Sequence, residues 1–382
     1  MKLLNSIIAI GPQSNMSLKR FSGQSVMFDG AVRAFQERVG NVDVVDILSS
    51  STNSKTYKRI LDYIVIVIKL FCKCLFKKYD AAYYTSSFGK FGIYRDIIII
   101  SILLCFKVKI VLHQFGADLS GISTVKPFFK KRLQNQLQYV SSIIVEGHYM
   151  ESLFSDISIV KGKVVVIPNG LPIEGMNANH PKQYNPQEPF RMFYLSNLIY
   201  SKGWFDVLQA VDILINREHR KVECIFAGRF MSSPDDQPNN HNTKQFFDDY
   251  VKDHQIVDSV RYMVGLYGDE KDEAFSSHHV FLLPSYYINE GQPVSILEAM
   301  AYGCVPIVTN YRHIPMMVND TNGCFVNAES PQEIVSAVID LMANPALYNK
   351  KSCQCITDYN TKFKFDVYIQ QIMNVLEDAV NE

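Results

Sequence analysis

The chain has 382 residues, more than one ordinary hydrophobic core accommodates, so we expect two domains. Its 38 basic and 38 acidic side chains cancel and 47% of its residues are hydrophobic, which argues against a disordered chain. Residues 1–180 carry 22 Lys and Arg against 12 Asp and Glu, whereas residues 181–382 carry 16 against 26, so either the first half faces something anionic or the halves attract each other.

Short apolar runs alternate with helical stretches through the first half of the chain. The predicted strands are Leu3–Ile10, Val42–Leu48, Ala81–Thr85, Val108–His113, Ser142–Val145 and Val164–Ile167. Helices are predicted between them, including Val26–Val39 and Lys126–Gln138. A polar, proline-containing linker is predicted at 179–190.

The second half repeats the same alternation. Its predicted strands are Phe190–Leu195, Val222–Ala227, Arg261–Met263, Val280–Leu283, Val305–Thr309 and Gly323–Val326. Its predicted helices are Trp204–Asn216, Thr243–Asp253, Pro293–Tyr302, Pro331–Met342 and a final one near Phe365–Val380. Strand–helix alternation of this kind predicts an α/β fold with two doubly wound parallel sheets. The predicted domains are 1–178 and 191–362, with a terminal helix at 363–382.

Two apolar runs, Ile64–Phe76 and Ile97–Phe106, fall short of the ~20 residues that span a bilayer, so we expect core helices. The first run is accompanied at helical spacing by lysines: Lys69, Lys73, Lys77 and Lys78. A helix of this kind also suits an anionic membrane surface, and both interpretations stay open. The eight cysteines show no zinc spacing and mostly lie in apolar runs, which favours a cytoplasmic protein with reduced thiols, free or peripheral on the inner face of the plasma membrane.

The stretch INEGQPVSILEAMAYGCVPIVT, which begins at Ile288, places Glu290 just before a predicted helix and Glu298 within it. The start of that helix is formed by Gly291, Gln292, Pro293 and Val294. Free backbone N–H groups at a helix start suit a phosphate. A carboxylate beside such a site binds neutral hydroxyls, and a second one binds a vicinal diol. Together these features suit a nucleotide sugar.

The longer stretch FLLPSYYINEGQPVSILEAMAYGCVPIVT resembles the signature of retaining glycosyltransferases of the family-four group, which have the GT-B architecture. The resemblance implies two Rossmann-like domains facing across a cleft, with the acceptor on the first and the donor on the second. It implies that Glu290 contacts the donor sugar and that Glu298 binds the ribose. It also implies that the terminal helix packs on the first domain.

LSNLIYSKGWFDVLQAV resembles the segment in which this family places an Arg and a Lys against the donor diphosphate. Lys202 matches the lysine, whereas Asn197 stands at the arginine position. Asn carries no charge, so either another cation compensates, with Arg229 in AGRF as the candidate, or catalysis is weak.

In the first domain, Gly23 lies in a Gly/Ser-containing stretch similar to the family's glycine loop, which borders the donor phosphates. His113 ends a predicted strand and matches a histidine that lines the family's cleft, where it would position the sugar or share a proton. The basic and aromatic segment KPFFKKRLQ, 126–134, is either a solvated helix face or a contact for a lipid-linked acceptor or anionic lipid.

The function expected is transfer of a hexose-type sugar, with retained configuration, from a UDP- or GDP-sugar to a saccharide or lipid-linked acceptor in surface polysaccharide or glycolipid synthesis. No cofactor, metal or nucleic acid is expected, since no D-x-D motif is flanked by apolar residues and Asp235 and Asp236 sit in a polar loop. The alternatives are a catalytically weak homologue that acts as a binding partner, a glycogen-synthase-like or sucrose-related transferase with a soluble acceptor, and a nucleotide-sugar epimerase. The absence of G-x-G-x-x-G counts against the epimerase.

Overall fold

The structure is a computed structural model that describes residues 3–14, 23–47, 56–87, 92–115, 124–155, 160, 162–171, 181–233 and 243–382. The chain divides into two compact units, each treated by itself below. Unit 1 comprises Met1–Pro172 and Phe365–Glu382, and unit 2 comprises Ile173–Lys364. No helix among the described residues is long and apolar enough to cross a membrane.

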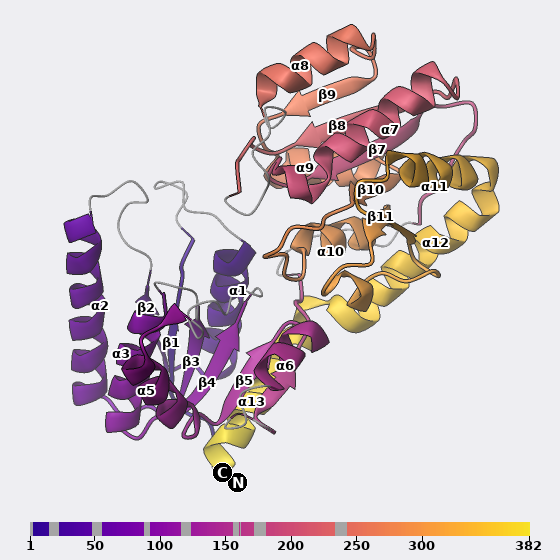
Figure 1. Cartoon of the computed structure of the whole chain (residues 1–382). Coiled ribbons are helices and arrows are strands. Elements are labelled where there is room, and N and C mark those ends of the chain that lie inside the picture. The colour runs from indigo at the N-terminus through magenta and orange to yellow at the C-terminus, as the bar shows by residue number, and fades with distance from the viewer. Residues whose placement is uncertain are drawn as a thin grey trace. The chain divides into compact units, whose positions relative to one another are not determined.

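Unit 1 is built on a six-stranded parallel sheet in the order β2-β1-β3-β4-β5-β6 (Figure 1). Its strands are β1 (Ile7–Gly11), β2 (Val42–Asp46), β3 (Ala81–Ser86), β4 (Lys109–Gln114), β5 (Ser142–Val145) and β6 (Val164–Val166). Its helices are α1 (Gly23–Arg38), α2 (Thr56–Phe76), α3 (Gly92–Cys105), α5 (Pro127–Leu137), α6 (His148–Ser155) and α13 (Phe365–Asn381). The central strands are buried on both sides, which is why they read as continuous apolar runs in the sequence.

The helices of unit 1 form a layer on each side of its sheet. The residues of α2, α3, α5 and α6 join one buried cluster with Ile8, Ile10 and Leu112. The residues of α1 and α13 join the other with Ile7, Ala9 and Tyr83. The last helix in the chain therefore completes a core that begins with the first strand.

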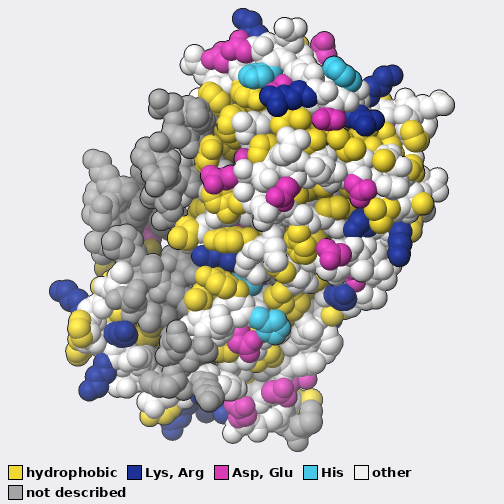
Figure 2. Space-filling view, turned by 45° about the vertical axis from the view of Figure 1, so that its right-hand side comes forward, with side chains coloured by type: hydrophobic (Ala, Val, Ile, Leu, Met, Phe, Trp, Pro, Cys, Tyr) yellow, Lys and Arg dark blue, Asp and Glu magenta, His cyan; other side chains and the backbone are white. Residues whose placement is uncertain are grey.

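Unit 2 is built on a second six-stranded parallel sheet, in the order β12-β11-β10-β7-β8-β9. Its strands are β7 (Phe190–Leu195), β8 (Val222–Ala227), β9 (Val260–Met263), β10 (Val280–Leu283), β11 (Val305–Thr309) and β12 (Cys324–Val326). Its helices are α7 (Trp204–Asn216), α8 (Lys244–Asp253), α9 (Gly268–Ser277), α10 (Val294–Ala301), α11 (Pro331–Ala343) and α12 (Pro345–Asp358). Short helical turns lie at η2 (Tyr200–Lys202), η3 (Ile314–Met316) and η4 (Tyr359–Phe363). On the face shown in Figure 2, acidic and basic side chains are interspersed with hydrophobic ones.

The predicted α/β class with two doubly wound parallel sheets is confirmed. The apolar run Ile64–Phe76, expected to be a core helix or a membrane-surface helix, joins the core on one side only. Its helix α2 buries Ile66, Leu70 and Cys74, whereas Ile68 and Leu75 on the opposite side are more than half exposed. The part of the predicted linker that the structure describes, residues 181–189, packs on unit 2 through Lys182, whose ammonium donates hydrogen bonds to two backbone carbonyls.

Candidate functional site

The site of unit 2 lies where the order of its strands changes direction. From β7 the chain adds β8 and β9 on one side, and it then returns to add β10, β11 and β12 on the other. In open α/β sheets, ligands bind outside the carboxyl ends of the strands at this switch point. Lys202 follows β7 and Glu290 follows β10, so the two candidate residues come from the strands on either side of the switch point.

Lys202 and Glu290 form an ion pair. The Lys202 ammonium lies 3.2 Å from one oxygen of Glu290, and the Ser285 hydroxyl donates to the other. The side chains of Lys202 and Glu290 are 16% and 6% exposed, and the Tyr287 ring lies 5.3 Å from the ammonium. A buried charge pair of this kind needs both partners and their extra hydrogen bonds to be stable. It places one cation directly beside one strong hydrogen-bond acceptor.

A tight turn holds this ion pair in place. Gly203 has a φ of +75°, and a Cβ there would lie 2.5 Å from the Pro284 carbonyl oxygen, so a side chain would push η2 away from the end of β10. The backbone N–H of Tyr286 donates to the Ser201 carbonyl at 2.8 Å. The segments that carry Lys202 and Glu290 are therefore fixed to each other through their backbones.

Glu298 lies on α10 with its side chain only 9% exposed. The Lys271 ammonium, on α9, lies 2.6 Å from one of its oxygens. Burial raises the pKa of the Glu298 carboxyl, and the charge and hydrogen bond of Lys271 act in the opposite direction. Lys271 is not predicted from the sequence, because it lies in the polar stretch GDEKDE, where nothing distinguishes it from a solvated lysine.

Asn197 and Arg229 lie side by side on neighbouring segments. The backbone bridge between Leu198 and Phe230 continues the register of β7 and β8, which aligns Asn197 with Arg229. Both side chains are exposed. Gly228 has a φ of +152°, and a Cβ there would collide with the carbonyl oxygen of Ser196, so only glycine permits this approach. Arg229 thus lies on the segment next to the position where the sequence lacks an arginine.

The start of α10 faces the same end of the sheet. Pro293 precedes the first helical residue, Val294, with φ of −65°, and no side chain caps the helix among the residues described. Gln292 is buried and Gly291 is half-buried. The positive end of an uncapped helix is suited to a phosphate, which agrees with the interpretation of the sequence.

The two candidate residues of the first domain lie in unit 1. His113 on β4 has no exposed surface, with its Nδ1 2.6 Å from the Tyr83 hydroxyl and its ring stacked on Phe115. Burial lowers the pKa of His113 to about 3, so the imidazole is neutral near neutral pH. Gly23 is exposed at the first residue of α1, and residues 15–22 before it lie outside the described part of the chain. The roles predicted for both residues stay predictions.

Acidic, histidine and cysteine side chains do not gather into a metal-binding group of three or more among the residues described. Asp235 and Asp236 lie outside those residues. All eight cysteines are free thiols. The expectation of metal-independent chemistry stays a prediction.

Comparison with known proteins agrees with this geometry. The family of glycosyl transferases group 1 matches residues 176–362, whereas no curated protein matches the chain. Solved structures that share the fold include a glycosyltransferase from Rickettsia africae, with a TM-score of 0.73, 13% identity, and coverage of 98% of this chain and 99% of that one. Another is sucrose-phosphate synthase from Thermosynechococcus elongatus, with a TM-score of 0.71, 14% identity and 98% of each chain. Anabaena Alr3699/HepE in complex with UDP aligns with a TM-score of 0.68, at 12% identity over 98% of this chain and 100% of that one. Residues 176–362, which lie mostly in the second unit, therefore match the glycosyl transferases group 1 family, and the chain has the GT-B fold.

Proposed function

We propose that the protein is a retaining glycosyltransferase that moves a hexose-type sugar from a nucleoside-diphosphate sugar to an acceptor hydroxyl. The observation that carries the proposal is the Lys202–Glu290 ion pair across the switch point of unit 2. In a nucleotide sugar the phosphate and the sugar are neighbours, so a cation and a hydroxyl acceptor must also be neighbours. The solved structures of the Anabaena protein contain UDP and UDP-glucose, which supports a donor of this class.

Each group at this end of the sheet has a place on such a donor. The Lys202 ammonium and the start of α10, Gly291–Val294, receive the diphosphate. The Glu290 carboxylate accepts hydrogen bonds from sugar hydroxyls, and Glu298 accepts them from the ribose. Because Glu298 is buried, its bonds to a diol form away from bulk water, where they are strong.

The reaction proposed is substitution at the anomeric carbon on one face of the sugar. The bond from this carbon to the phosphate oxygen breaks, and a bond to the acceptor oxygen forms on the same face. The acceptor proton passes to the departing phosphate, so no further base is required. Charge on the leaving phosphate is stabilised by Lys202 and, in place of the absent arginine, by Arg229 beside Asn197.

The acceptor is proposed to be a saccharide or a lipid-linked sugar, with a surface polysaccharide or glycolipid as the product and the cytoplasmic side of the membrane as the place of reaction. The neutral His113 would act on this reaction only as a hydrogen-bonding group at neutral pH. No resident metal is proposed.

A panel of UDP-, GDP- and ADP-sugars tests the proposal by thermal shift and then by hydrolysis with and without EDTA. We expect at least one donor to stabilise the chain, slow release of sugar with the anomeric configuration retained by NMR, and no effect of EDTA. The Lys202→Met variant should lose the shift, whereas Lys221→Met, an exposed lysine of unit 2, should keep it. Absence of a shift with every donor would refute the donor site.

The second candidate function is a catalytically weak homologue that binds a nucleotide sugar or a protein partner. Asn197 at the arginine position is the observation that favours it. A donor that shifts the melting temperature without hydrolysis or transfer to any acceptor would decide for this alternative.

A further inference from the structure

The outward side of helix α2 is apolar along its whole described length. Residues at helical spacing point away from the buried side, and all of them are exposed: Leu61, Ile64, Val65, Ile68, Phe71, Cys72, Leu75 and Phe76. We call this set the α2 face. Phe76 is 83% exposed and Val65 is 62% exposed. A surface helix normally presents polar residues to water, so an apolar outward face marks an interaction surface.

The α2 face continues into an apolar groove. Helix α3 lies between α2 and α5 on one side of the sheet and packs on both of them (Figure 1). The groove has a volume of about 560 Å³ and is lined by Val67, Ile68, Phe71, Ile97, Ile98, Ser101, Ile102, Phe128, Phe129 and Arg132. Phe128 at its edge is 71% exposed. The only charged side chain in the lining is a cation.

Basic side chains surround this apolar surface. Exposed ones lie on α2, just after it, and on and just before α5: Lys69, Lys78, Lys126, Lys130, Lys131 and Arg132. Among the side chains described on α2, α3 and α5, the acidic ones are Asp62 and Asp96, and Asp96 is fully buried against Arg95. The surface therefore combines exposed apolar side chains with a net positive rim.

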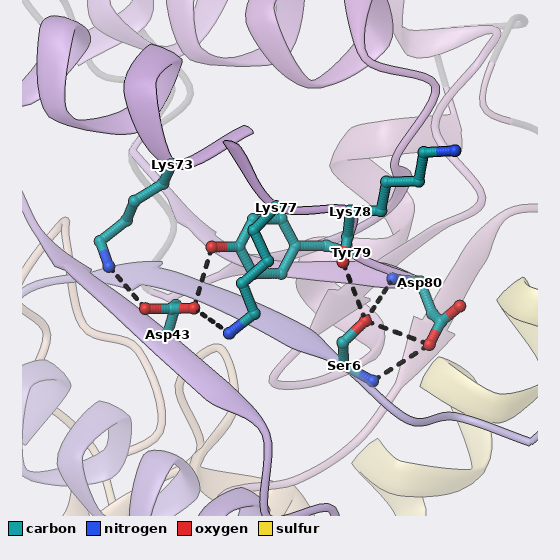
Figure 3. A network of polar contacts seen from close by, with 7 residues as sticks. All are labelled: Ser6, Asp43, Lys73, Lys77, Lys78, Tyr79 and Asp80. Carbon is teal, nitrogen blue, oxygen red and sulfur yellow. Dashed lines mark hydrogen bonds and ion pairs between the residues drawn. The ribbon is translucent and has the colours of Figure 1, made fainter. Parts of the chain in front are cut away.

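Two of the four lysines that accompany the apolar run in the sequence do not belong to this rim. Lys73 and Lys77 both turn inward to Asp43 on β2, with the Lys73 ammonium 2.5 Å from one of its oxygens (Figure 3). Together with the Tyr79 hydroxyl they hold the Asp43 pKa well below its usual range. Lys73 of α2 and Lys77 just after it thus fasten the end of the helix to the sheet, whereas the α2 face stays on the outside.

We propose that the α2 face and the groove beside it dock on an anionic lipid bilayer. A bilayer takes up an apolar helix face to a depth of about 5–10 Å without shape complementarity, and its anionic headgroups attract the basic rim. A second copy of the chain on the same surface would place one basic rim against another, which is unfavourable. The inference does not depend on donor chemistry, since its residues lie on α2, α3 and α5 or beside these helices, and none of them is among the candidate residues of the donor site.

Vesicle flotation tests the proposal with the full chain. One set of vesicles is phosphatidylcholine, and the other is equal parts phosphatidylcholine and phosphatidylglycerol. We expect flotation with the anionic vesicles, little with the neutral ones, and a loss of binding as salt rises. The variant Lys130→Glu/Lys131→Glu should bind at least roughly tenfold more weakly. The matched variant Lys221→Glu/Lys252→Glu, exposed lysines of unit 2, should bind like the wild type.

The apolar part is tested by Phe71→Ser/Phe76→Ser, which should weaken binding roughly tenfold or more, against Val257→Ser as an exposed control in unit 2. Unchanged melting of these variants shows that they fold. Absence of flotation with both the neutral and the anionic vesicles would overturn the proposal. Binding by all variants that equals binding by the wild type would overturn it as well. Self-association in sedimentation that Phe71→Ser/Phe76→Ser abolishes would also overturn it, because a second copy would then be the occupant.

Discussion

Replacement of Glu298 by alanine tests the proposed ribose contact most directly. Lys271 occupies one carboxylate oxygen at 2.6 Å, so a vicinal diol has mainly the other oxygen to bind. A charge-assisted hydrogen bond in a buried site contributes about 1.5–3 kcal/mol. The loss of one such bond weakens nucleotide binding roughly 10-fold to 150-fold. Isothermal titration with UDP, GDP and ADP measures this change.

The conservative variant Glu298→Gln separates charge from shape. It retains an acceptor oxygen but loses the ion pair, so its affinity should lie between those of the wild type and Glu298→Ala. Glu273→Ala, an exposed glutamate on α9, is the matched control and should leave binding unchanged. Fluorescence of Trp204, the single tryptophan and fully buried in unit 2, reports whether each variant folds. Nucleotide affinity equal to wild type in a folded Glu298→Ala protein would refute the ribose role.

Three further variants test other parts of the site. Lys202→Met should lower turnover roughly 100-fold or more, because a preorganised cation is lost from the leaving phosphate, and equal turnover in Lys202→Met and Lys221→Met would contradict this. Asn197→Arg should raise turnover roughly tenfold if the missing charge limits the reaction, and an unchanged rate would show that it does not. Burial raises the pKa of Asp206 to about 6 from an ordinary 3.8, so wild-type stability falls as pH rises through this window. Asp206→Asn should therefore be up to about 3 kcal/mol more stable than wild type at pH 7 and about equal to it near pH 3, below the ordinary pKa, measured by urea unfolding with Trp204 fluorescence. A difference that is constant with pH would refute the assignment.

Much of the fold could be predicted because its central strands are buried on both faces. Ser142–Val145, Phe190–Leu195 and Val280–Leu283 are short apolar runs bounded by polar residues, and the structure has strands at these residues. The parallel arrangement follows from the helices between them. Helix α9 was not predicted, because its sequence GDEKDEAFSS has little apolar periodicity and reads like a loop.

Residue types and their spacing predict which residues belong to the candidate site, but they do not predict which of these residues pair with each other. Glu290, Glu298 and Lys202 lie in a recognisable pattern, but the pairing of Lys202 with Glu290 depends on β7 and β10 becoming neighbours, and the pairing of Lys271 with Glu298 depends on how α9 and α10 pack. Spacing along the chain does not determine which strands become neighbours. Likewise, the period of α2 predicts a helix but does not show which of its apolar sides meets the sheet. In the structure Lys73 and Lys77 pair with Asp43 on the sheet side, and this partner is 30 and 34 residues away from them in sequence.

The position of α13 in unit 1 has a consequence for synthesis on the ribosome. Unit 2 is one continuous segment, whereas the core of unit 1 takes Ile369, Ile372 and Leu376 from the far side of that segment. Domains usually fold in the order in which they emerge, N-terminal first. Here the first sheet must wait, with one face covered by α1 alone, until the whole of unit 2 has been translated. The nascent first unit is therefore the part of this chain most in need of chaperone protection.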